Sequence, residues 1–453
     1  MSINRRLDAL AKPFVSLVGR FYPDAFIFVI VLSIFTFIFA LIFTESNAVD
    51  TITAWGNGLP KLFTFTAQIS IIMITAHALA HTEPVEKVLN RIGSVPNSSI
   101  QAYALVTFVS GLASLFAWSF GLIVGGIISK FVALGCKQKK IKVHYPLLVA
   151  SAYSGYVIWH MGYSSSAALF VASENHMLKD KIGIIPVTET IFTSFNITIA
   201  IITLAAITII NPLMRPASNR EILQVDSSVF KNNSITEHNK TKDLTFAQKL
   251  ENNKFISFFF GGVLLFFILF TFLKKGFFLD LNFVSWTFLC LGLLLCNSPM
   301  HYVKLVNNAA PTVGPIILQY PFYAGIMGIM ADTGLIQVLA NNIVELSSSG
   351  MLGFYSFLSA GLVNMFIPSG GGQWAVQGPV MIEAAQKLGV EPYVVVLGVA
   401  YGDQWTNMIQ PFWTIPLLAI AGLHMRQIMG YTFVIFILTG FIYSTSLLYL
   451  GSG

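Results

Sequence analysis

Most residues of this chain that could bind a solute or move a proton lie in short polar interruptions of long apolar segments. Four interruptions stand out, at residues 114–126, 154–166, 368–374 and 401–414. Backbone that leaves the helical conformation inside lipid is stable only where protein or a water-filled cavity satisfies its hydrogen bonds. The four interruptions therefore predict the walls of a binding site.

The third interruption is the most specific, because Pro368 and Ser369 are followed by three glycines and then by Gln373 and Trp374. Successive glycines expose backbone N–H and C=O groups at a turn. We expect a helix to begin near Gln373 and to direct its positive end toward an anion. The alternative is a tight connection without a ligand. A phosphate loop is excluded, since its GxxxxGK[ST] pattern is absent.

Hydroxyl, amide, imidazole and indole groups of these interruptions are the candidate substrate contacts. The serines could instead bond backbone carbonyls at kinks, and the tryptophans could mark the membrane interface. Five of the seven tryptophans fall in the interruptions, which favours cavity lining. The predicted substrate-binding residues are Ser114, Trp118, Ser119, Trp159, His160, Ser164, Ser165, Ser369, Gly370, Gly371, Gly372, Gln373, Trp374, Trp405 and Asn407.

Asp403 is an acid within an otherwise apolar segment. A carboxylate in the membrane interior is energetically costly and usually functional. We predict that Asp403, Asn364 and Ser114 couple an ion, either H⁺ or Na⁺. The alternative is that Asp403 is a structural partner of nearby polar side chains.

Histidine and cysteine indicate neither a metal site nor a cofactor. His77 and His81 are four residues apart, but the segment lacks the glutamate of a zinc-protease motif. The three cysteines form no metal-ligand spacing. His160 could contact substrate, relay protons or be structural.

The placement of basic residues limits the type of anion. All 26 Lys and Arg residues lie in loops, tails or segment edges. A dicarboxylate would usually be held by a fixed cation. An anion in this chain must rely on helix N-termini, hydroxyls and amides, with aromatic walls for an apolar tail. This favours a monocarboxylate with a short acyl chain.

Composition places these elements in a membrane. The 453 residues are 55% hydrophobic and 10% charged, whereas soluble domains carry about a quarter charged residues. The net charge of +6 comes from basic residues in short loops, which is the positive-inside pattern and not a nucleic-acid surface. We predict an all-α polytopic membrane protein with about 10 to 12 membrane segments. The apolar runs are 26–43, 62–80, 100–131, 146–172, 190–211, 256–273, 283–297, 313–331, 351–386, 392–422 and 428–449.

The two halves of the chain look alike at an offset of roughly 250 residues. Asn57, Gln68 and Thr82 in the first half match Asn308, Gln319 and Thr333 in the second. Runs 100–131 and 351–386 both read as helical hairpins, and runs 146–172 and 392–422 as discontinuous helices. The predicted division is a first transmembrane repeat at 1–211, a cytoplasmic linker at 212–255, and an extra span plus the second repeat at 256–453.

Loop charge predicts that the second repeat is inverted. The N-terminal 20 residues, the loop 130–142 and the linker are rich in Lys and Arg and are assigned to the cytoplasm. The loop 332–350 carries acids but no basic residue and is assigned to the outside. The N-terminus reads as an amphipathic cytoplasmic lead-in to an uncleaved first span.

The sequence resembles the bacterial short-chain fatty acid uptake transporter family over nearly its full length. The resemblance is carried by Phe21-Tyr22-Pro23-Asp24, WSFGLIVG, QYPFYAGIMGIM, IPSGGGQWAVQGP and AYGDQWTNMIQPFW. It implies uptake of fatty acids such as acetoacetate or butyrate across the bacterial inner membrane. It also implies kinship with ion-coupled transporters that have inverted repeats, often with an elevator motion in a homodimer. The family's first broken segment is typically glycine-rich after its tryptophan, whereas this chain has Trp159-His160-Met161-Gly162.

Together these observations predict a secondary active transporter of short-chain monocarboxylates, coupled to a cation and working by alternating access. Two other functions stay open. One is transport of another organic anion, such as a dicarboxylate, or exchange of a cation for a proton. The other is a membrane-embedded enzyme, for which His160 and Asp403 would have to meet. There is no ATP-binding motif.

Overall fold

The computed structural model describes residues 23–174, 176, 178–216, 222–225, 245–276 and 281–452. Regular structure in this part of the chain is entirely helical, as predicted. The first half contains α2 (Ala25–Phe43), α3 (Ala48–Gly58), η1 (Leu59–Leu62), α4 (Phe63–Ala80), α5 (Glu83–Gly93), α6 (Ser99–Phe116), α7 (Trp118–Gln138), α8 (Tyr145–Ser154), η2 (Gly155–Met161), α9 (Ser166–Val171), α10 (Lys179–Ile182), η3 (Val187–Glu189) and α11 (Ser194–Leu213). The second contains α13 (Phe246–Glu251), α14 (Lys254–Lys275), α15 (Leu281–Leu295), α16 (Pro299–Ala309), η5 (Ala310–Val313), α17 (Gly314–Asp332), α18 (Leu335–Val344), η6 (Ser349–Met351), α19 (Leu352–Asn364), α20 (Gly370–Leu388), α21 (Pro392–Thr406), η7 (Asn407–Ile409), α22 (Thr414–Ala421) and α23 (Met425–Ser452).

Eight helices in the described part of the chain are long and apolar enough to cross a membrane. Every predicted apolar run coincides with a helix, a hairpin or a broken helix. Two spans are longer than their runs, because α3 continues through η1 into α4, and α16 through η5 into α17. Hydropathy missed these extensions, since polar residues such as Lys61 and Lys304 dilute the apolar pattern.

The helices of the two halves follow each other in the same order. The series α2, α3–α4, α5, α6–α7, α8–η2 and α11 corresponds to α15, α16–α17, α18, α19–α20, α21–η7 and α23. Only α14, among the described spans, lacks a counterpart in the first half.

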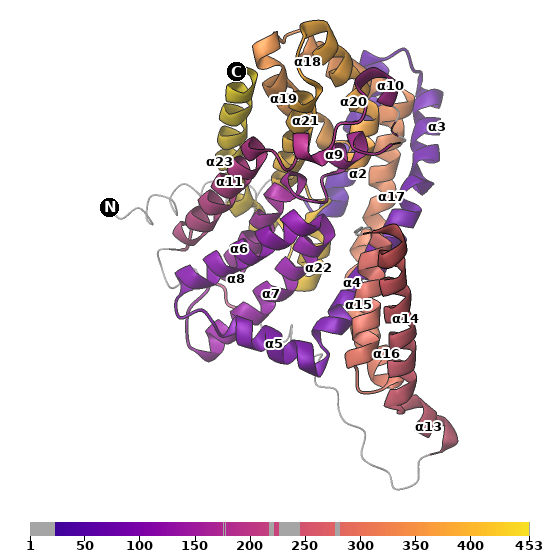
Figure 1. Cartoon of the computed structure of the whole chain (residues 1–453), viewed down its shortest axis with the longest axis vertical. Helices are drawn as coiled ribbons and strands as arrows, with labels where there is room; N and C mark the ends of the chain where they lie inside the picture. Colours follow the sequence, from indigo (N-terminus) through magenta and orange to yellow (C-terminus); the bar gives the residue numbers. More distant parts are fainter. Residues whose placement is uncertain are drawn as a thin grey trace.

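The two hairpins enter the molecule from opposite ends. In Figure 1, α6 and α7 lie in the half that holds α5, whereas α19 and α20 lie in the half that holds α18. The first broken segment packs through η2 against both α6 of the first hairpin and α21 of the second repeat. Inverted repeats therefore bring four interruptions of the helical backbone toward the middle of the fold.

Local sequence explains where many helices begin. Prolines in the first turn start α5, α8, α16 and α21, where a missing N–H costs no hydrogen bond. Side-chain caps start others, for example Asn47 at α3, Ser98 at α6 and Ser369 at α20. Local sequence thus explains the start of one helix in each hairpin, α6 in the first and α20 in the second.

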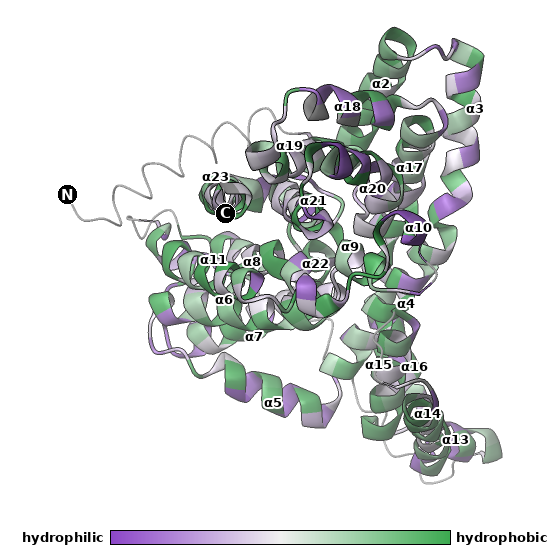
Figure 2. Cartoon of the chain, turned by 45° about the horizontal axis from the view of Figure 1, so that its top comes forward, coloured by the Kyte–Doolittle hydropathy of each residue, from purple (hydrophilic) through white to green (hydrophobic). Residues whose placement is uncertain are grey.

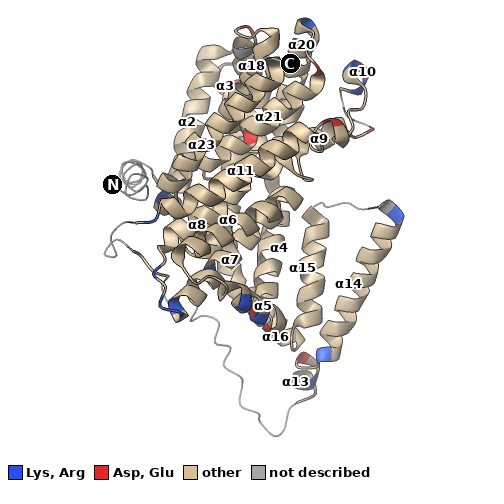
Figure 3. Ribbon diagram, turned by 60° about the vertical axis from the view of Figure 1, so that its left-hand side comes forward, with Lys and Arg blue, Asp and Glu red and all other residues tan. Residues whose placement is uncertain are grey.

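Apolar and charged residues separate as expected for a membrane protein. Figure 2 shows that α2, α14 and α15 present mostly hydrophobic residues. Lys and Arg gather at the end of the molecule that holds α5 and the connection from α7 to α8 (Figure 3). The N-terminal lead-in before residue 23 and most of the linker, 217–221 and 226–244, lie outside the described residues.

Candidate functional site

The first hairpin turns at a single extended residue, Ala117, with φ −152° and ψ 129°. Alanine offers no side-chain acceptor, so the N–H groups at the start of α7 need other partners. The Trp118 N–H donates to Ser164 Oγ at 2.9 Å. Within the described residues the Ser119 N–H has no protein acceptor. The start of α7 is therefore open to a ligand.

The first broken segment folds against this hairpin. After the 3₁₀ turn η2, Gly162 becomes extended, and the Tyr163 N–H donates to Leu115 O at 2.8 Å. This bond joins the end of α6 to the chain that leaves η2. It places the serine triplet that begins at Ser164 beside the hairpin tip.

The second hairpin ends in a capped helix start. Ser369 Oγ accepts from the Gly372 N–H at 3.3 Å, and Ser369 O accepts from the Gln373 N–H at 2.7 Å. The glycines therefore form the first turn of α20, which begins at Gly370. The prediction that this helix begins near Gln373 was wrong, because the serine cap allows glycines to enter the helix.

Gly370 allows a close approach between the second hairpin and the first broken segment. A Cβ on Gly370 would lie 2.5 Å from His160 Nε2 and 2.9 Å from the Trp159 ring. Any larger residue would push the start of α20 away from η2. The N–H groups of Gly370 and Gly371 have no protein acceptor within the described part of the chain.

The side-chain amide of Asn364 holds the second broken segment in place. The Asn364 side-chain N–H₂ lies within hydrogen-bond distance of Asp403 O (2.9 Å), Thr406 Oγ1 (2.9 Å) and Asn407 Oδ1 (2.7 Å). Gln410 in turn donates to Asn364 O at 3.1 Å. These bonds satisfy the backbone where α21 unwinds into η7.

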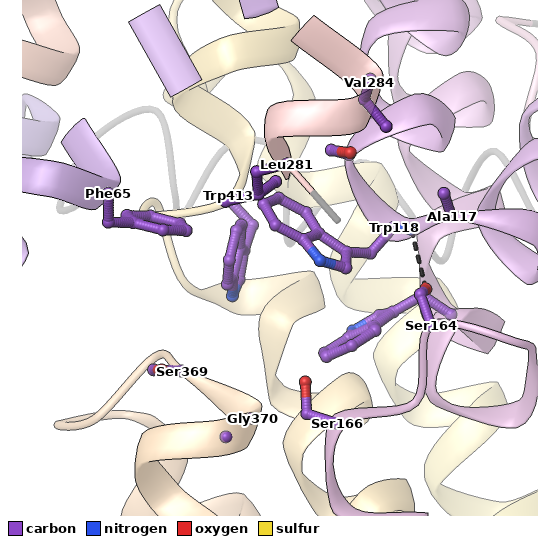
Figure 4. Close-up of a pocket in the computed structure, with 13 residues that line it drawn as sticks. Phe65, Ala117, Trp118, Ser164, Ser166, Leu281, Val284, Ser369, Gly370 and Trp413 are labelled. Carbon is purple, nitrogen blue, oxygen red and sulfur yellow. Dashed lines mark hydrogen bonds between the residues drawn. The ribbon is translucent and has the colours of Figure 1, made fainter. Parts of the chain in front are cut away.

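A cavity of about 320 Å³ opens between the two hairpin tips and η2 (Figure 4). Trp118 and Trp413 form one wall with ring centroids 4.8 Å apart. Phe65 stacks on Trp118 at 6.0 Å. The lining residues are Phe65, Ala117, Trp118, Ser119, Trp159, Ser164, Ser166, Leu281, Val284, Ser369, Gly370, Gly371 and Trp413.

The electrostatics of this cavity favour a small anion. None of the described lining residues is Lys, Arg, Asp or Glu. Ser119 of α7 and Gly370 of α20 both line it, so two helix starts with unshared N–H groups meet there. The positive ends of helices attract anions. The aromatic walls suit an apolar tail.

His160 and Asp403 meet behind the cavity wall. His160 Nε2 lies 3.6 Å from Asp403 Oδ1, and both side chains are 1% exposed. The His160 N–H donates to Gln404 Oε1 at 2.9 Å, and its Nδ1 lies 3.2 Å from Ser165 Oγ. The corresponding breaks of the two repeats are therefore in direct contact.

The structure brings part of the predicted substrate-binding set together. Several predicted residues lie behind the cavity wall, where they hold the backbone in place. Ser114 donates to Ser110 O, Gln373 donates to Ala360 O, and Asn407 Nδ2 lies 3.4 Å from Asp403 Oδ1. Seven predicted residues line the cavity, and these are Trp118, Ser119, Trp159, Ser164, Ser369, Gly370 and Gly371. The eight outside the lining are Ser114, His160, Ser165, Gly372, Gln373, Trp374, Trp405 and Asn407.

Two predicted tryptophans point elsewhere. Trp405 stacks on Phe436 at 4.3 Å and donates its indole N–H to Phe436 O, so it faces α23. Trp374 is fully buried beside Gly378 within α20. Of the predicted ion-coupling residues, Asn364 contacts the backbone of Asp403, whereas Ser114 lies in the first hairpin.

Sequence reasoning missed several lining residues. Trp413 and Ser166 lie in interruptions that had been singled out, so a signal for them existed. Phe65, Leu281 and Val284 come from apolar helices in which nothing distinguishes them from lipid-facing residues. Ala117 carries no functional side chain and lines the cavity through the hairpin turn.

Comparison with known proteins gives consistent results. A family model described as short chain fatty acid transporter matches residues 6–450. A protein of Escherichia coli K12 is 34% identical, over 94% of this chain and 96% of its own length. A protein of Haemophilus influenzae is also 34% identical, over 98% of this chain and 100% of its own length. Both are named for short-chain fatty acid transport.

Two solved structures are also similar in part. The YdaH transporter of Alcanivorax borkumensis has a TM-score of 0.45 and 13% identity, covering 95% of this chain and 98% of its own. MtrF of Neisseria gonorrhoeae has a TM-score of 0.42 and 14% identity, covering 96% of each chain.

Proposed function

This chain belongs to the short chain fatty acid transporter family, and on that premise we propose that it carries short-chain monocarboxylates such as butyrate or acetoacetate by cation symport. The supporting observation is that two helix N-termini, whose first N–H groups lack protein acceptors in the described structure, meet an aromatic wall in one small cavity. The carboxylate binds at the starts of α7 and α20. The acyl chain lies against Trp118 and Trp413.

Transport of a dicarboxylate is less well supported by this cavity. A second carboxylate would need its own donors or a fixed cation. The described lining offers neither Lys nor Arg for it, and Phe65, Leu281 and Val284 add only apolar side chains. The same lining suits a methyl or methylene group.

The geometry of the site argues against an enzymatic function. Ser165 contacts His160, and His160 contacts Asp403, so the three side chains form a chain of contacts similar to that of a serine hydrolase triad. Ser165 is fully buried and does not line the cavity. Its hydroxyl therefore cannot reach the carbon atom of a bound carboxylate, and carriage of the anion fits the geometry better.

The transport cycle follows from the inverted repeats. Hairpins that enter from opposite ends can each close the cavity toward one side of the membrane, which is the basis of alternating access. We place the protein in the bacterial inner membrane with the N-terminus and the Lys- and Arg-rich end in the cytoplasm. A homodimer is the assembly expected for this family.

Counterflow in proteoliposomes tests the function. Vesicles preloaded with unlabelled acetoacetate should take up labelled acetoacetate at a saturable rate above that of protein-free vesicles. Unlabelled butyrate should compete, and succinate should not. A rate equal to that of protein-free vesicles would overturn the proposal, and strong competition by succinate would favour the dicarboxylate alternative.

A further inference from the structure

The most unusual buried group in the described core is the pair formed by His160 and Asp403. Their 3.6 Å separation exceeds the length of a hydrogen bond. His160 Nε2 and Asp403 Oδ2 are both buried without a hydrogen-bond partner. Buried polar atoms nearly always have partners, so an imidazole and a carboxyl left in this state need an explanation.

The groups that face the pair carry no fixed charge. From η2, Tyr156 lies within electrostatic range of Asp403, and from α21 the Gln404 side chain accepts the backbone N–H of His160. The chain before α9 supplies Ser165. The three groups are therefore an amide, a hydroxyl and a phenol.

Hairpin elements close the remaining sides of the pair. From α19, Asn364 binds the backbone of Asp403, and from η7 Asn407 Nδ2 lies 3.4 Å from Asp403 Oδ1. From α20, Gly370 approaches the pair so closely that a Cβ there would lie 2.5 Å from His160 Nε2. Lys130, the buried lysine of the described core, lies instead beside His77 and His81. Any charge on the pair must therefore be balanced by protons or by a mobile ion.

The pair lies directly behind the wall at which we place the substrate carboxylate. Gly370 and Trp159 both line the cavity. His160 Nε2 would be 2.5 Å from a Cβ on Gly370, and its ring centroid is 3.6 Å from that of Trp159. A carboxylate at the start of α20 would thus bring a negative charge close to the pair, in a region of low dielectric constant.

We propose that the coupling cation is a proton and that His160 and Asp403 bind it together as the carboxylate enters. This inference rests on the proposed transport function. Without substrate the pair shares one proton and is neutral. When the anion binds, the pair takes up a second proton, which gives an imidazolium and a carboxylic acid. The bound complex is then neutral, and both cargoes leave on the other side.

The composition of the pair favours a proton over Na⁺. Hard cations such as Na⁺ are held by oxygen ligands. Here the atom that faces the carboxyl is an imidazole nitrogen, which binds a proton far better than an alkali cation. We therefore treat the pair as one site that holds one or two protons.

Calorimetry on the purified full-length protein tests the proposal. Acetoacetate binding is measured between pH 6 and 8 in two buffers of different ionisation enthalpy, which gives the number of protons taken up. We expect about one proton for each bound carboxylate, and hence a tenfold weaker binding for each pH unit on the alkaline side. Addition of NaCl in place of KCl should leave the affinity unchanged.

Two variants and two matched controls assign the proton to the pair. His160→Gln and Asp403→Asn should still bind acetoacetate but take up less than a fifth of the wild-type protons. Asp403→Glu should restore the uptake. His424→Gln and Asp332→Asn change an exposed histidine and an exposed acid and should match the wild type.

The outcomes separate the two proposals. Wild-type binding without proton uptake, or binding that requires Na⁺, would overturn the proton site, whether or not the variants fold. Normal proton uptake in both His160→Gln and Asp403→Asn would also overturn it. Absence of acetoacetate binding together with absence of counterflow would instead overturn the proposed function.

Discussion

Trp118 and Trp413 meet edge to face, with ring centroids 4.8 Å apart and planes at 66°. One comes from the first residue of α7 and the other from the residue before α22, so this contact joins the tip of the first hairpin to the break in the second repeat. The same two rings form a wall of the cavity (Figure 4). In the proposed binding mode, their contact limits the length available to the acyl chain of the substrate.

Trp413→Phe should shift substrate preference toward longer chains. The smaller ring leaves space at the wall, and one methylene in an apolar pocket is worth about 1–3 kcal/mol. We expect hexanoate to gain at least about fivefold relative to butyrate in competition assays. The buried Trp413 indole N–H has no hydrogen-bond partner in the described structure, so any fall in melting temperature should come from lost ring packing alone.

Trp405→Phe is the matched control for this change. Trp405 donates to Phe436 O at 2.7 Å and lies outside the cavity. Its replacement should lower stability by about 1 kcal/mol through the lost hydrogen bond and leave chain-length preference unchanged. An unchanged preference in Trp413→Phe would show that this ring does not contact the acyl chain.

Gly370→Ala should impair transport, although alanine favours helices over glycine by about 0.5–1 kcal/mol. The added Cβ would lie 2.5 Å from His160 Nε2 and would push α20 off η2. Overpacking of this kind costs about 1–3 kcal/mol. We expect counterflow rates to fall by about tenfold or more.

Gly371→Ala changes the next glycine of the same helix turn. Its Cβ would meet its first neighbour, Ser166 Cβ, at an ordinary 3.9 Å. Transport in this variant should stay within about threefold of wild type, a difference of less than 1 kcal/mol. Equal rates in the two variants would contradict the close approach at position 370.

Ser164→Ala should weaken the tip of the first hairpin. The change removes Ser164 Oγ, which is the one acceptor of the Trp118 N–H in the described structure. Loss of a helix-capping acceptor costs about 0.5–2 kcal/mol. Thermal unfolding should report this loss, and acetoacetate affinity should fall with it.

Ser173→Ala provides a comparison for the serine change. The Ser173 hydroxyl is exposed and donates to Phe170 O at 2.8 Å, away from the cavity. Its replacement should leave stability within about 0.5 kcal/mol of wild type. If both serine variants unfold at the wild-type temperature, the bond from Trp118 does not hold the hairpin tip.

His81, which caps the end of α4, should make the protein less stable in acid. Burial lowers the pKa of His81 below 6.5, the hydrogen bond from its ring to His77 O partly opposes this, and the charge of Lys130 adds to the lowering. The unfolded chain then binds the proton more tightly than the folded one. Stability is fully present above about pH 6.5 and is lost as the pH falls below it.

Melting temperatures at pH 7.5 and 5.5 measure this effect. His81→Gln should lose less stability between the two pH values than wild type does. His424→Gln, which changes an exposed histidine, should behave as wild type. An identical loss in all three proteins would remove His81 as a cause.

Much of the fold could be predicted because lipid imposes simple rules on sequence. Long apolar runs located the spans, and glycine, proline and polar residues located the hairpins and breaks. The parts missed were those in which local pattern and structure diverge. The glycines at 370–372 read as a turn, but the Ser369 cap draws them into α20.

The site was harder to predict than the fold, because interruption of a helix does not reveal which way a side chain points. Trp118 and Trp405 both lie in breaks, yet one lines the cavity and the other stacks on Phe436. Leu281 contributes to the lining from an apolar helix that carries no sequence signal. These differences arise from tertiary packing between distant segments.

The unshared N–H groups at the starts of α7 and α20 also govern what the cavity contains between transport cycles. Donors of this kind are hydrated whenever no anion binds them, because an empty dry pocket would leave them without acceptors. In the proposed binding mode, each loading event would expel this solvent as the acyl chain covers the tryptophan faces. Substrate entry by this route would carry a negative change in heat capacity, and dehydration of the pocket would be part of the work of every turnover.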